Sequence, residues 1–381
     1  MATSRRTFLL GAAGASLAAT GCSSVAAQRA EELGAFTSLP GGSELLGPQA
    51  GVARLNNNEN PYGPAASALR MADYANRKGA YYAMGATPVL TKMIARSHGV
   101  SPEQVTLSTG SAEALSAIAM VYGRRGPIVA PRLFFDATVM YAKRLGLAEV
   151  KRAPMQSDMS IDLAAIEALV NGDTGFVSLC NPNNPTGLLT DAATLKPVVK
   201  RMAGKTLVVV DEAYMELTDD PVANSCVDLV KAGHNVVVSR TFSKLYGMAG
   251  LRVGYTLSQP EVAKTIRGAN MTWMSGVGLA AAIGCFEDSA FVERSRRKIL
   301  EARQMTADAL QKLGVEVLPS AANFVYFKSG ITANRLQEAL AAQNIQIRGQ
   351  YMDYDAWSRV SMGKLEDVAR FCKVLPRVLN A

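Results

Sequence analysis

Histidine and cysteine are scarce in this chain. Its 381 residues include 2 His and 5 Cys. His98 and His234 belong to no metal motif and no catalytic triad, and we expect both to be structural. The cysteines are scattered, with no CxxC pair and no metal-ligand spacing. The sequence therefore predicts no metal site, and nothing in it requires a disulfide.

Long apolar spans, internal repeats and low-complexity tracts are absent as well. A helix that crosses a membrane needs about 20 consecutive apolar residues, so we expect no transmembrane span. The net charge of +8 is spread along the chain, and the basic run 294–298 begins an amphipathic helical pattern with a solvated face. We expect no nucleic-acid partner. With 49% hydrophobic residues, the chain can bury one large core and a smaller one.

Two apolar runs in the middle of the chain end in reactive residues. Thr206–Val210 leads into Asp211–Tyr214, and Asn235–Ser239 leads into Thr241–Lys244, with Arg252 eight residues further on. Apolar runs of this length favour buried strands, and strand ends carry the reactive groups of open α/β sheets. Together the two ends supply a carboxylate, a phenol, an amine and a guanidinium.

These four groups meet the needs of one cofactor, pyridoxal phosphate. The cofactor acts as an electron sink, and it needs a lysine to hold it as an imine and an acid to keep its ring nitrogen protonated. Lys244 suits the first role and Asp211 the second. Lys244, once released by substrate, is also the natural acid and base at the substrate's α-carbon. We expect burial among cations to lower the pKa of Lys244.

Several segments carry a resemblance to a known family. Thr241–Tyr255 resembles the lysine region of fold-type I, class I/II aminotransferases, most closely the histidinol-phosphate aminotransferase branch. Asn181–Gly187 resembles the family loop whose second Asn-Pro touches the ring hydroxyl of the cofactor. The resemblance continues at Leu55–Pro64, Gly110–Glu113 and Arg359–Gly363, and so spans about residue 50 to the C-terminus.

The resemblance implies an α/β fold with two domains. The large domain has a mainly parallel sheet sandwiched by helices, and the smaller domain is α+β. The alternation of strand and helix patterns between Val105 and Tyr255 independently predicts the parallel sheet. We predict an N-terminal segment and part of the small domain at 28–80, the large cofactor-binding domain at 81–288 and the C-terminal small domain at 289–381.

The resemblance also implies a cofactor site. Asn184 and Tyr214 would bond the ring hydroxyl, while Ser111, Ala112, Thr241 and Arg252 would hold the phosphate. At Gly110-Ser111 an apolar strand gives way to a helix whose free N–H groups suit an anion, although an ordinary capped helix explains the same pattern. Tyr82 matches a position that reaches the partner subunit's cofactor phosphate, which implies a homodimer. Simple packing of Tyr81 and Tyr82 is the alternative.

An aromatic residue that stacks on the cofactor is expected after Pro131. Arg132-Leu133 stands where the family has an aromatic, so Phe134 or Phe135 takes its place. Counting back from Gly146 favours Phe135. Placing Asp136 as a helix N-cap favours Phe134.

Substrate-binding residues are expected toward the C-terminus. Arg359 matches the arginine that grips the acidic group of the substrate, and Arg348 matches a second arginine near its distal end. Asn323 is a plausible neighbour, and Asn184 faces the same region. The stretch Gln350–Ser358 is aromatic-rich and departs from the Gly/Pro-containing loop of the family, which leaves the substrate open.

The resemblance implies a transaminase in which Lys244, Asp211 and Tyr214 carry out catalysis. The donor would be an amino acid or an amino-alcohol phosphate, and a 2-oxo acid would accept the amine. A lyase, racemase, decarboxylase or oxidase shares the same electron sink and is the alternative. A protein that only binds the cofactor or an amine is a further alternative, but it would have no need of the proton-transfer lysine.

The N-terminus indicates export. Arg5-Arg6 followed by Phe8-Leu9-Leu10 and a short Gly/Ala-rich stretch is typical of a twin-arginine signal peptide, which we place at 1–27. That route carries folded proteins, so the cofactor could be loaded before export to the periplasm. Cleavage after Ala27 would release a soluble protein, whereas processing at Cys22 would leave a lipid anchor. We favour the soluble form.

Overall fold

The computed structural model describes residues 38–39, 43–271 and 273–380. Residues 1–52 and 53–381 form two separate units. In the first, β1 (Ser38–Leu39) pairs antiparallel with β2 (Ser43–Glu44). The predicted signal peptide at 1–27 and the possible lipid anchor at Cys22 lie outside the described residues and stay predictions. Among the helices that are described, none combines the length and apolar character needed to span a bilayer.

A seven-stranded sheet dominates the second unit. Its strands are β4 (Val105–Ser108), β5 (Ile128–Pro131), β6 (Val150–Ala153), β7 (Phe176–Cys180), β8 (Leu207–Asp211), β9 (Val236–Thr241) and β10 (Gly254–Leu257), in the order β4-β10-β9-β8-β7-β5-β6. β10 runs antiparallel to both of its neighbours, and the remaining pairings are parallel. The predicted mainly parallel sheet is confirmed.

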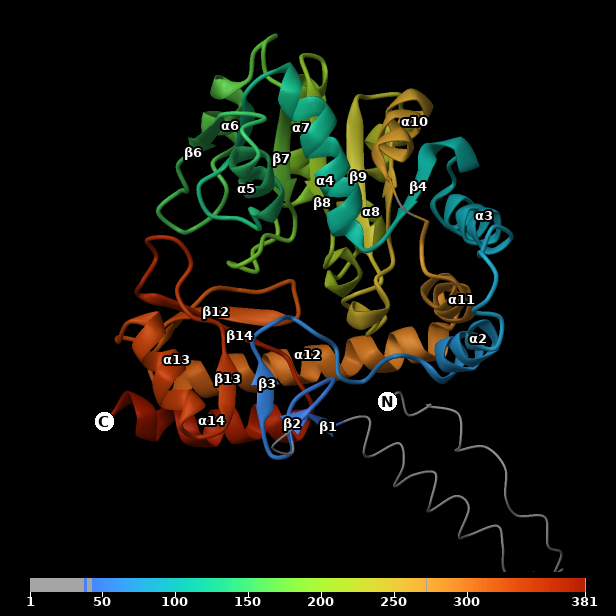
Figure 1. Cartoon of the computed structure of the whole chain (residues 1–381). Helices are drawn as coiled ribbons and strands as arrows, with labels where there is room; N and C mark the ends of the chain where they lie inside the picture. The colour runs from blue at the N-terminus through green and yellow to red at the C-terminus, as the bar shows by residue number, and fades with distance from the viewer. Residues whose placement is uncertain (1–37, 40–42, 272, 381) are drawn as a thin grey trace, which may run out of the picture. The chain divides into compact units, whose positions relative to one another are not determined.

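Helices cover both faces of this sheet (Figure 1). One face packs against α4 (Ser111–Tyr122), α5 (Ala137–Arg144) and α10 (Pro260–Ala269), and the other against α6 (Leu163–Leu169), α7 (Ala192–Ala203) and α9 (Val227–Lys231). Alternate residues of β8 enter opposite cores: Leu207 and Val209 join the first, and Val208 and Val210 join the second. Burial on both faces explains why these strands read as unbroken apolar runs.

A smaller region is built around an antiparallel sheet. β11 (Glu316–Val317), β12 (Phe324–Lys328) and β14 (Trp357–Ser361) form that sheet, while β13 (Ile345–Ile347) pairs in parallel with β3 (Ala53–Leu55). Helices α12 (Ser289–Lys312), α13 (Ala333–Ala341) and α14 (Leu365–Leu379) pack against these strands around a separate core. Figure 1 shows this region in orange and red beneath the large sheet, with β3 in blue beside β13.

The remaining elements complete the second unit. They are the helices α2 (Ala66–Asn76), α3 (Ala86–His98), α8 (Pro221–Asn224) and α11 (Gly276–Cys285), and the 3-10 turns η1 (Pro102–Gln104), η2 (Gly123–Arg125), η3 (Met215–Leu217) and η4 (Ala249–Leu251). The large region is thus an α/β sandwich and the small region is α+β, as predicted. The exact domain boundaries at 80 and 288 stay predictions.

The segment after β3 is fastened to the connection between β9 and β10. The Asn60 side chain donates hydrogen bonds to the Leu245 carbonyl at 2.7 Å and to Ser295 Oγ at 2.6 Å. Gly63 and Gly247 touch backbone to backbone, because a Cβ at Gly63 would lie 2.7 Å from the Cα of Gly247. A side chain at either position would push the two segments apart.

A buried ionic network joins β9 to the residues that follow β8. Arg240 and Glu212 are almost fully buried and pair at 2.7 Å, and Arg240 also contacts Glu216 at 3.0 Å. Glu212 accepts further hydrogen bonds from Ser225 Oγ and from the Cys226 N–H, both at 2.7 Å. Each charge is therefore fully partnered, which a buried ion pair requires if it is not to destabilise the fold.

We predict that Arg240→Leu lowers the free energy of unfolding by about 3–5 kcal/mol, because it leaves Glu212 buried without its counter-charge. Arg201→Leu is the matched control: Arg201 pairs with Glu167 through two 2.7 Å hydrogen bonds at the surface. Its loss should cost no more than about 1 kcal/mol. Urea unfolding of both variants measures the difference, and equal losses would contradict a structural role for the buried pair.

Candidate active site

A cavity of about 460 Å³ lies where the large and small regions meet. The carboxyl ends of parallel strands converge on one edge of a sheet, so residues far apart in sequence share this wall. Most of the residues predicted for the site line it: Ser111, Ala112, Phe134, Phe135, Asn184, Asp211, Tyr214, Thr241, Lys244, Arg252, Arg348 and Arg359. Tyr82 and Asn323 are not among its lining residues.

Asp211 is the last residue of β8 and is only 7% exposed. Its Oδ1 atom is buried and has no hydrogen-bond partner. Burial raises the pKa of Asp211 to about 7, although the nearby Lys244 opposes the shift. A buried carboxylate oxygen without a donor fits a protonated ring nitrogen, which would supply both a hydrogen bond and a positive charge.

Lys244 lies in the connection between β9 and β10 and reaches the same cavity. Its Nζ is 3.4 Å from the carbonyl oxygen of Asn57 and 5.8 Å from the centre of the Tyr214 ring. Burial lowers the pKa of Lys244 to about 8, and the positive charge of Arg359 adds to the shift. The amine is therefore partly neutral near pH 8, the form that can attack a carbonyl carbon.

The start of α4 forms a cradle for an anion. Gly110 adopts φ +70°, and a Cβ there would overlap the guanidinium of Arg252. A Cβ at Gly254 would likewise overlap the backbone nitrogen of Ser111. Arg252 adopts φ 54° and donates a hydrogen bond from NH1 to the Ala249 carbonyl at 2.9 Å. A guanidinium beside a helix N-terminus fits the phosphate of the cofactor.

A hydrogen-bond network surrounds the hydroxyl of Tyr214. Asn58 Nδ2 lies 3.0 Å from the Tyr214 oxygen, and Asn184 Nδ2 lies 3.4 Å from it. Arg359 NH1 donates to Asn184 Oδ1 at 2.7 Å, which links the tyrosine to β14. The sequence did not single out Asn58 as a site residue. Its position inside the motif Leu55–Pro64 was the available signal, because a polar residue there has no role in the β3 pairing.

Two arginines and one tyrosine form the wall on the small region. Arg359 is 4% exposed, and its guanidinium carbon lies 5.3 Å from the centre of the Tyr351 ring. The guanidinium carbon of Arg348 also lies 5.3 Å from the centre of this ring. Tyr351 belongs to the atypical aromatic stretch and was not predicted as a site residue. Its ring holds two like charges near each other through cation–π contacts.

The two predicted stacking residues differ in environment. Phe134 is buried in the core that α4 and α5 share, and Arg152 lies 5.8 Å from its ring centre. Phe135 is 40% exposed and also lines the cavity. Asp136 is the N-cap residue of α5, as expected, but its carboxylate binds Arg152 at 2.9 Å instead of capping the helix. Which ring stacks on the cofactor stays a prediction.

The two predicted residues outside the cavity wall have other surroundings. Asn323 is fully buried behind the wall, and its Nδ2 donates to the Asn58 carbonyl at 2.9 Å. It therefore supports the segment that faces the cavity, and its predicted role in binding substrate stays a prediction. Tyr82 is 79% exposed and packs edge-on against Trp273, with ring centres 4.4 Å apart. The contact predicted between Tyr82 and the cofactor phosphate of a partner subunit stays a prediction.

Comparison with known proteins agrees with this geometry. Residues 50–375 match the family model for aminotransferase class I and II. The histidinol-phosphate aminotransferase of Anaeromyxobacter sp. (strain Fw109-5) is 36% identical over 334 residues, which cover 87% of this chain and 92% of that protein. The enzyme of the same name from Symbiobacterium thermophilum is 34% identical over 333 residues, or 86% of this chain and 91% of the relative.

A solved structure supports the cofactor. The histidinol-phosphate aminotransferase of Sinorhizobium meliloti, in complex with pyridoxal-5'-phosphate, superposes with a TM-score of 0.79 at 29% identity. The match covers 86% of this chain and 91% of that one. The orphaned Asp211 oxygen, the Lys244 amine and the Arg252 cradle fit the same group. The chain belongs to the class I and II aminotransferases, with pyridoxal phosphate as its cofactor.

Proposed function

We propose that this aminotransferase takes its amine from a donor that ends in a phosphate or a carboxylate, with histidinol phosphate as the first candidate, and passes it to a 2-oxo acid. The observation that carries the proposal is the Arg359 guanidinium. It is buried at the cavity, and its Nε atom has no hydrogen-bond partner. The names of the relatives support the choice of donor.

The surroundings of Arg359 favour an anion as its missing partner. Within the described part of the chain, its hydrogen bonds go to the Asn184 side chain and, at 2.6 Å, to the Asn56 carbonyl, and to no carboxylate. Burial lowers the pKa of Arg359, and the neighbouring Arg348 acts in the same direction. A dianionic phosphate would offset both effects by contacting two guanidiniums, more fully than a carboxylate would.

The roles of the remaining residues follow from their positions. Pyridoxal phosphate, when bound, withdraws electrons from the α-carbon of the substrate. Asp211 would keep a proton on the ring nitrogen, because a positive charge is what its buried carboxylate lacks. Lys244 would move a proton at the α-carbon, a task suited to an amine whose pKa is about 8. Ser111, Ala112, Thr241 and Arg252 would hold the phosphate.

We also propose that two copies of the chain form the active enzyme. Large apolar side chains are exposed around Tyr82: Tyr81, Met84 and Trp273 are each more than half exposed. A neighbouring cavity of about 690 Å³ is lined largely by apolar residues, including Met84, Met274 and Leu279. Solvated monomers rarely leave so much contiguous apolar surface uncovered. A second copy would bury this surface and bring Tyr82 toward the other cavity.

The buried carboxylate leads to a prediction about pH. The pKa of Asp211 is raised from 3.8 to about 7 in the folded apoenzyme, so the folded state loses stability as pH rises through that window. Asp211→Asn removes this dependence. From pH 5 to pH 8 the free energy of unfolding of the variant should rise by roughly 2–3 kcal/mol relative to that of the wild-type apoenzyme. The relative rise is about 1.4 kcal/mol for each pH unit below the pKa of Asp211. Chemical denaturation of both apoenzymes measures this, and a constant difference at the two pH values would contradict it.

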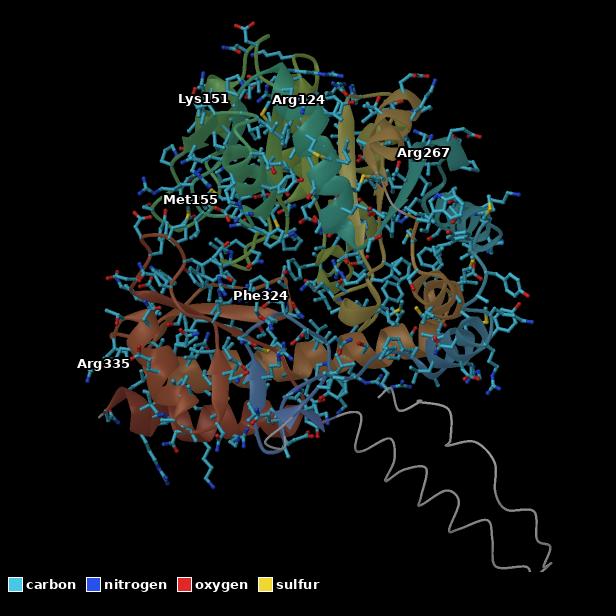
Figure 2. All side chains as sticks on the ribbon, in the orientation of Figure 1. Arg124, Lys151, Met155, Arg267, Phe324 and Arg335 are labelled. Atoms are coloured by element: carbon cyan, nitrogen blue, oxygen red, sulfur yellow. The ribbon has the colours of Figure 1, made fainter. Side chains whose placement is uncertain are left out.

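The substrate proposal is tested by a half-reaction screen. Histidinol phosphate should convert the cofactor to its amine form faster than histidinol, which lacks the phosphate, and faster than aromatic amino acids. Arg359→Lys should lower kcat/KM for histidinol phosphate about 10- to 100-fold, because lysine cannot make the bidentate contact. Arg335→Lys, an exposed arginine on α13 that points outward in Figure 2, is the control and should change little. Equal rates with histidinol and its phosphate would rule out the proposal that Arg359 binds the phosphate of the donor.

The dimer is tested by placing a charge in the exposed apolar surface. Trp273→Glu should shift the protein from dimer to monomer in analytical ultracentrifugation and weaken cofactor binding, because Tyr82 would no longer reach a partner. Val222→Glu is the matched control, since Val222 is 86% exposed on α8, outside the group of residues around Tyr82. A wild-type protein that is monomeric at micromolar concentration would contradict the proposal.

A further inference from the structure

Asn58 holds an unusual backbone position beside the cavity. It is 2% exposed and adopts φ 55°, a left-handed conformation that few residues other than glycine favour. Its N–H donates to Ser361 Oγ at 2.9 Å, and its carbonyl accepts from Asn323 Nδ2 at 2.9 Å. The backbone is thus fixed from both sides, which leaves the side-chain amide aimed at Tyr214.

The orientation of the Asn184 amide is set by chemistry. Arg359 can only donate hydrogen bonds, so the atom that accepts its NH1 at 2.7 Å must be the Asn184 oxygen. The NH2 group of Asn184 therefore faces the Tyr214 oxygen, at 3.4 Å.

The same reasoning fixes the Asn58 amide. Ser361 Oγ already accepts the Asn58 N–H, and its own hydrogen goes to Asn58 Oδ1 at 2.6 Å. The Asn58 NH2 group is left to donate to the Tyr214 oxygen at 3.0 Å. The reversed amide would leave the Ser361 hydrogen without this acceptor.

Tyr214 thus receives two N–H donors and can donate to neither of them. Its own hydrogen has to point elsewhere, and its ring lies in the wall of the cavity that Lys244 enters. The charged and titratable groups that face Tyr214 are Lys244, Arg359, Asp211 and Cys180. Burial raises the pKa of Tyr214, so the phenol stays protonated and keeps this hydrogen.

We propose that Asn58 is a positioning residue that turns the O–H of Tyr214 toward the ring oxygen of the bound cofactor. The inference rests on the proposed contact between Tyr214 and that oxygen, and it adds the residue that gives the contact its direction. A donor that faces an oxygen stabilises negative charge on it. Asn58 would therefore favour the deprotonated form of the bound cofactor at neutral pH.

The test is a pH titration of the visible absorbance of the loaded enzyme. Asn58→Gly keeps the left-handed backbone and removes the amide. We expect the absorbance midpoint to rise by about one pH unit. Cofactor affinity, measured by dialysis, should fall about tenfold, the equivalent of that shift. Tyr214→Phe should raise the midpoint by at least as much.

The double variant Asn58→Gly/Tyr214→Phe decides whether Asn58 acts through Tyr214. Its midpoint should equal that of Tyr214→Phe alone, because the amide then has no hydroxyl to direct. Asn344→Gly is the matched control. Asn344 is exposed, adopts φ 58° and does not line the cavity, and its exchange for glycine should leave the midpoint unchanged.

The outcomes distinguish the positioning role of Asn58 from the contact between Tyr214 and the cofactor. If Tyr214→Phe moves the midpoint and Asn58→Gly does not, or if the two shifts add in the double variant, Asn58 has no positioning role and the Tyr214 contact stands. If Tyr214→Phe moves nothing, both ideas fail. Should Asn58→Gly not fold, Ser361→Ala frees the same amide, and it should raise the midpoint by a smaller amount. An unchanged midpoint there would overturn the inference.

Discussion

Desolvation of charge governs this structure. Asp211 and Glu212 are neighbours at the end of one strand, and both are buried. Glu212 is fully paired with Arg240 and serves the fold. Asp211 has an oxygen with no partner. At Glu212 the free-energy cost of burying a carboxylate is offset by Arg240. At Asp211 the bound cofactor would have to offset it. That difference separates a structural carboxylate from a functional one.

Arg359 repeats this logic on the opposite wall. Its guanidinium is buried against neutral hydrogen-bond acceptors and an aromatic ring, so an anionic substrate would supply the negative charge that is missing. Lys244 lies between the two walls, and its pKa is lowered first by burial and then by Arg359. The cavity therefore holds buried charged groups that lack partners of opposite charge. The cofactor would supply the partner of Asp211, and the substrate that of Arg359.

Much of this could be read from the sequence, because the large sheet is buried on both faces. Unbroken apolar runs mark such strands, and the residues that follow them reach one edge, which is why Asp211, Thr241 and Lys244 could be placed together. The resemblance added Arg359. Asn58 could not be placed, because its partner lies 156 residues away and the contact depends on how the segment after β3 crosses the lysine connection.

Asn323 was predicted beside the substrate, and its side chain bonds the Asn58 carbonyl. A turn before a strand does not reveal which way its side chain points. Tyr351 belongs to a stretch with no family pattern, so nothing in its spacing indicated the position between two arginines.

The single antiparallel strand of the large sheet has a mechanical consequence. Because β10 returns directly beside β9, Lys244 and Arg252 belong to the single connection between these two strands. If Lys244 and Arg252 hold the cofactor as proposed, its covalent and its ionic anchors lie on the same segment of backbone. A hinge movement of the small region would carry Arg359 toward or away from the substrate. Lys244 and Arg252 would keep the same distance from each other during that movement.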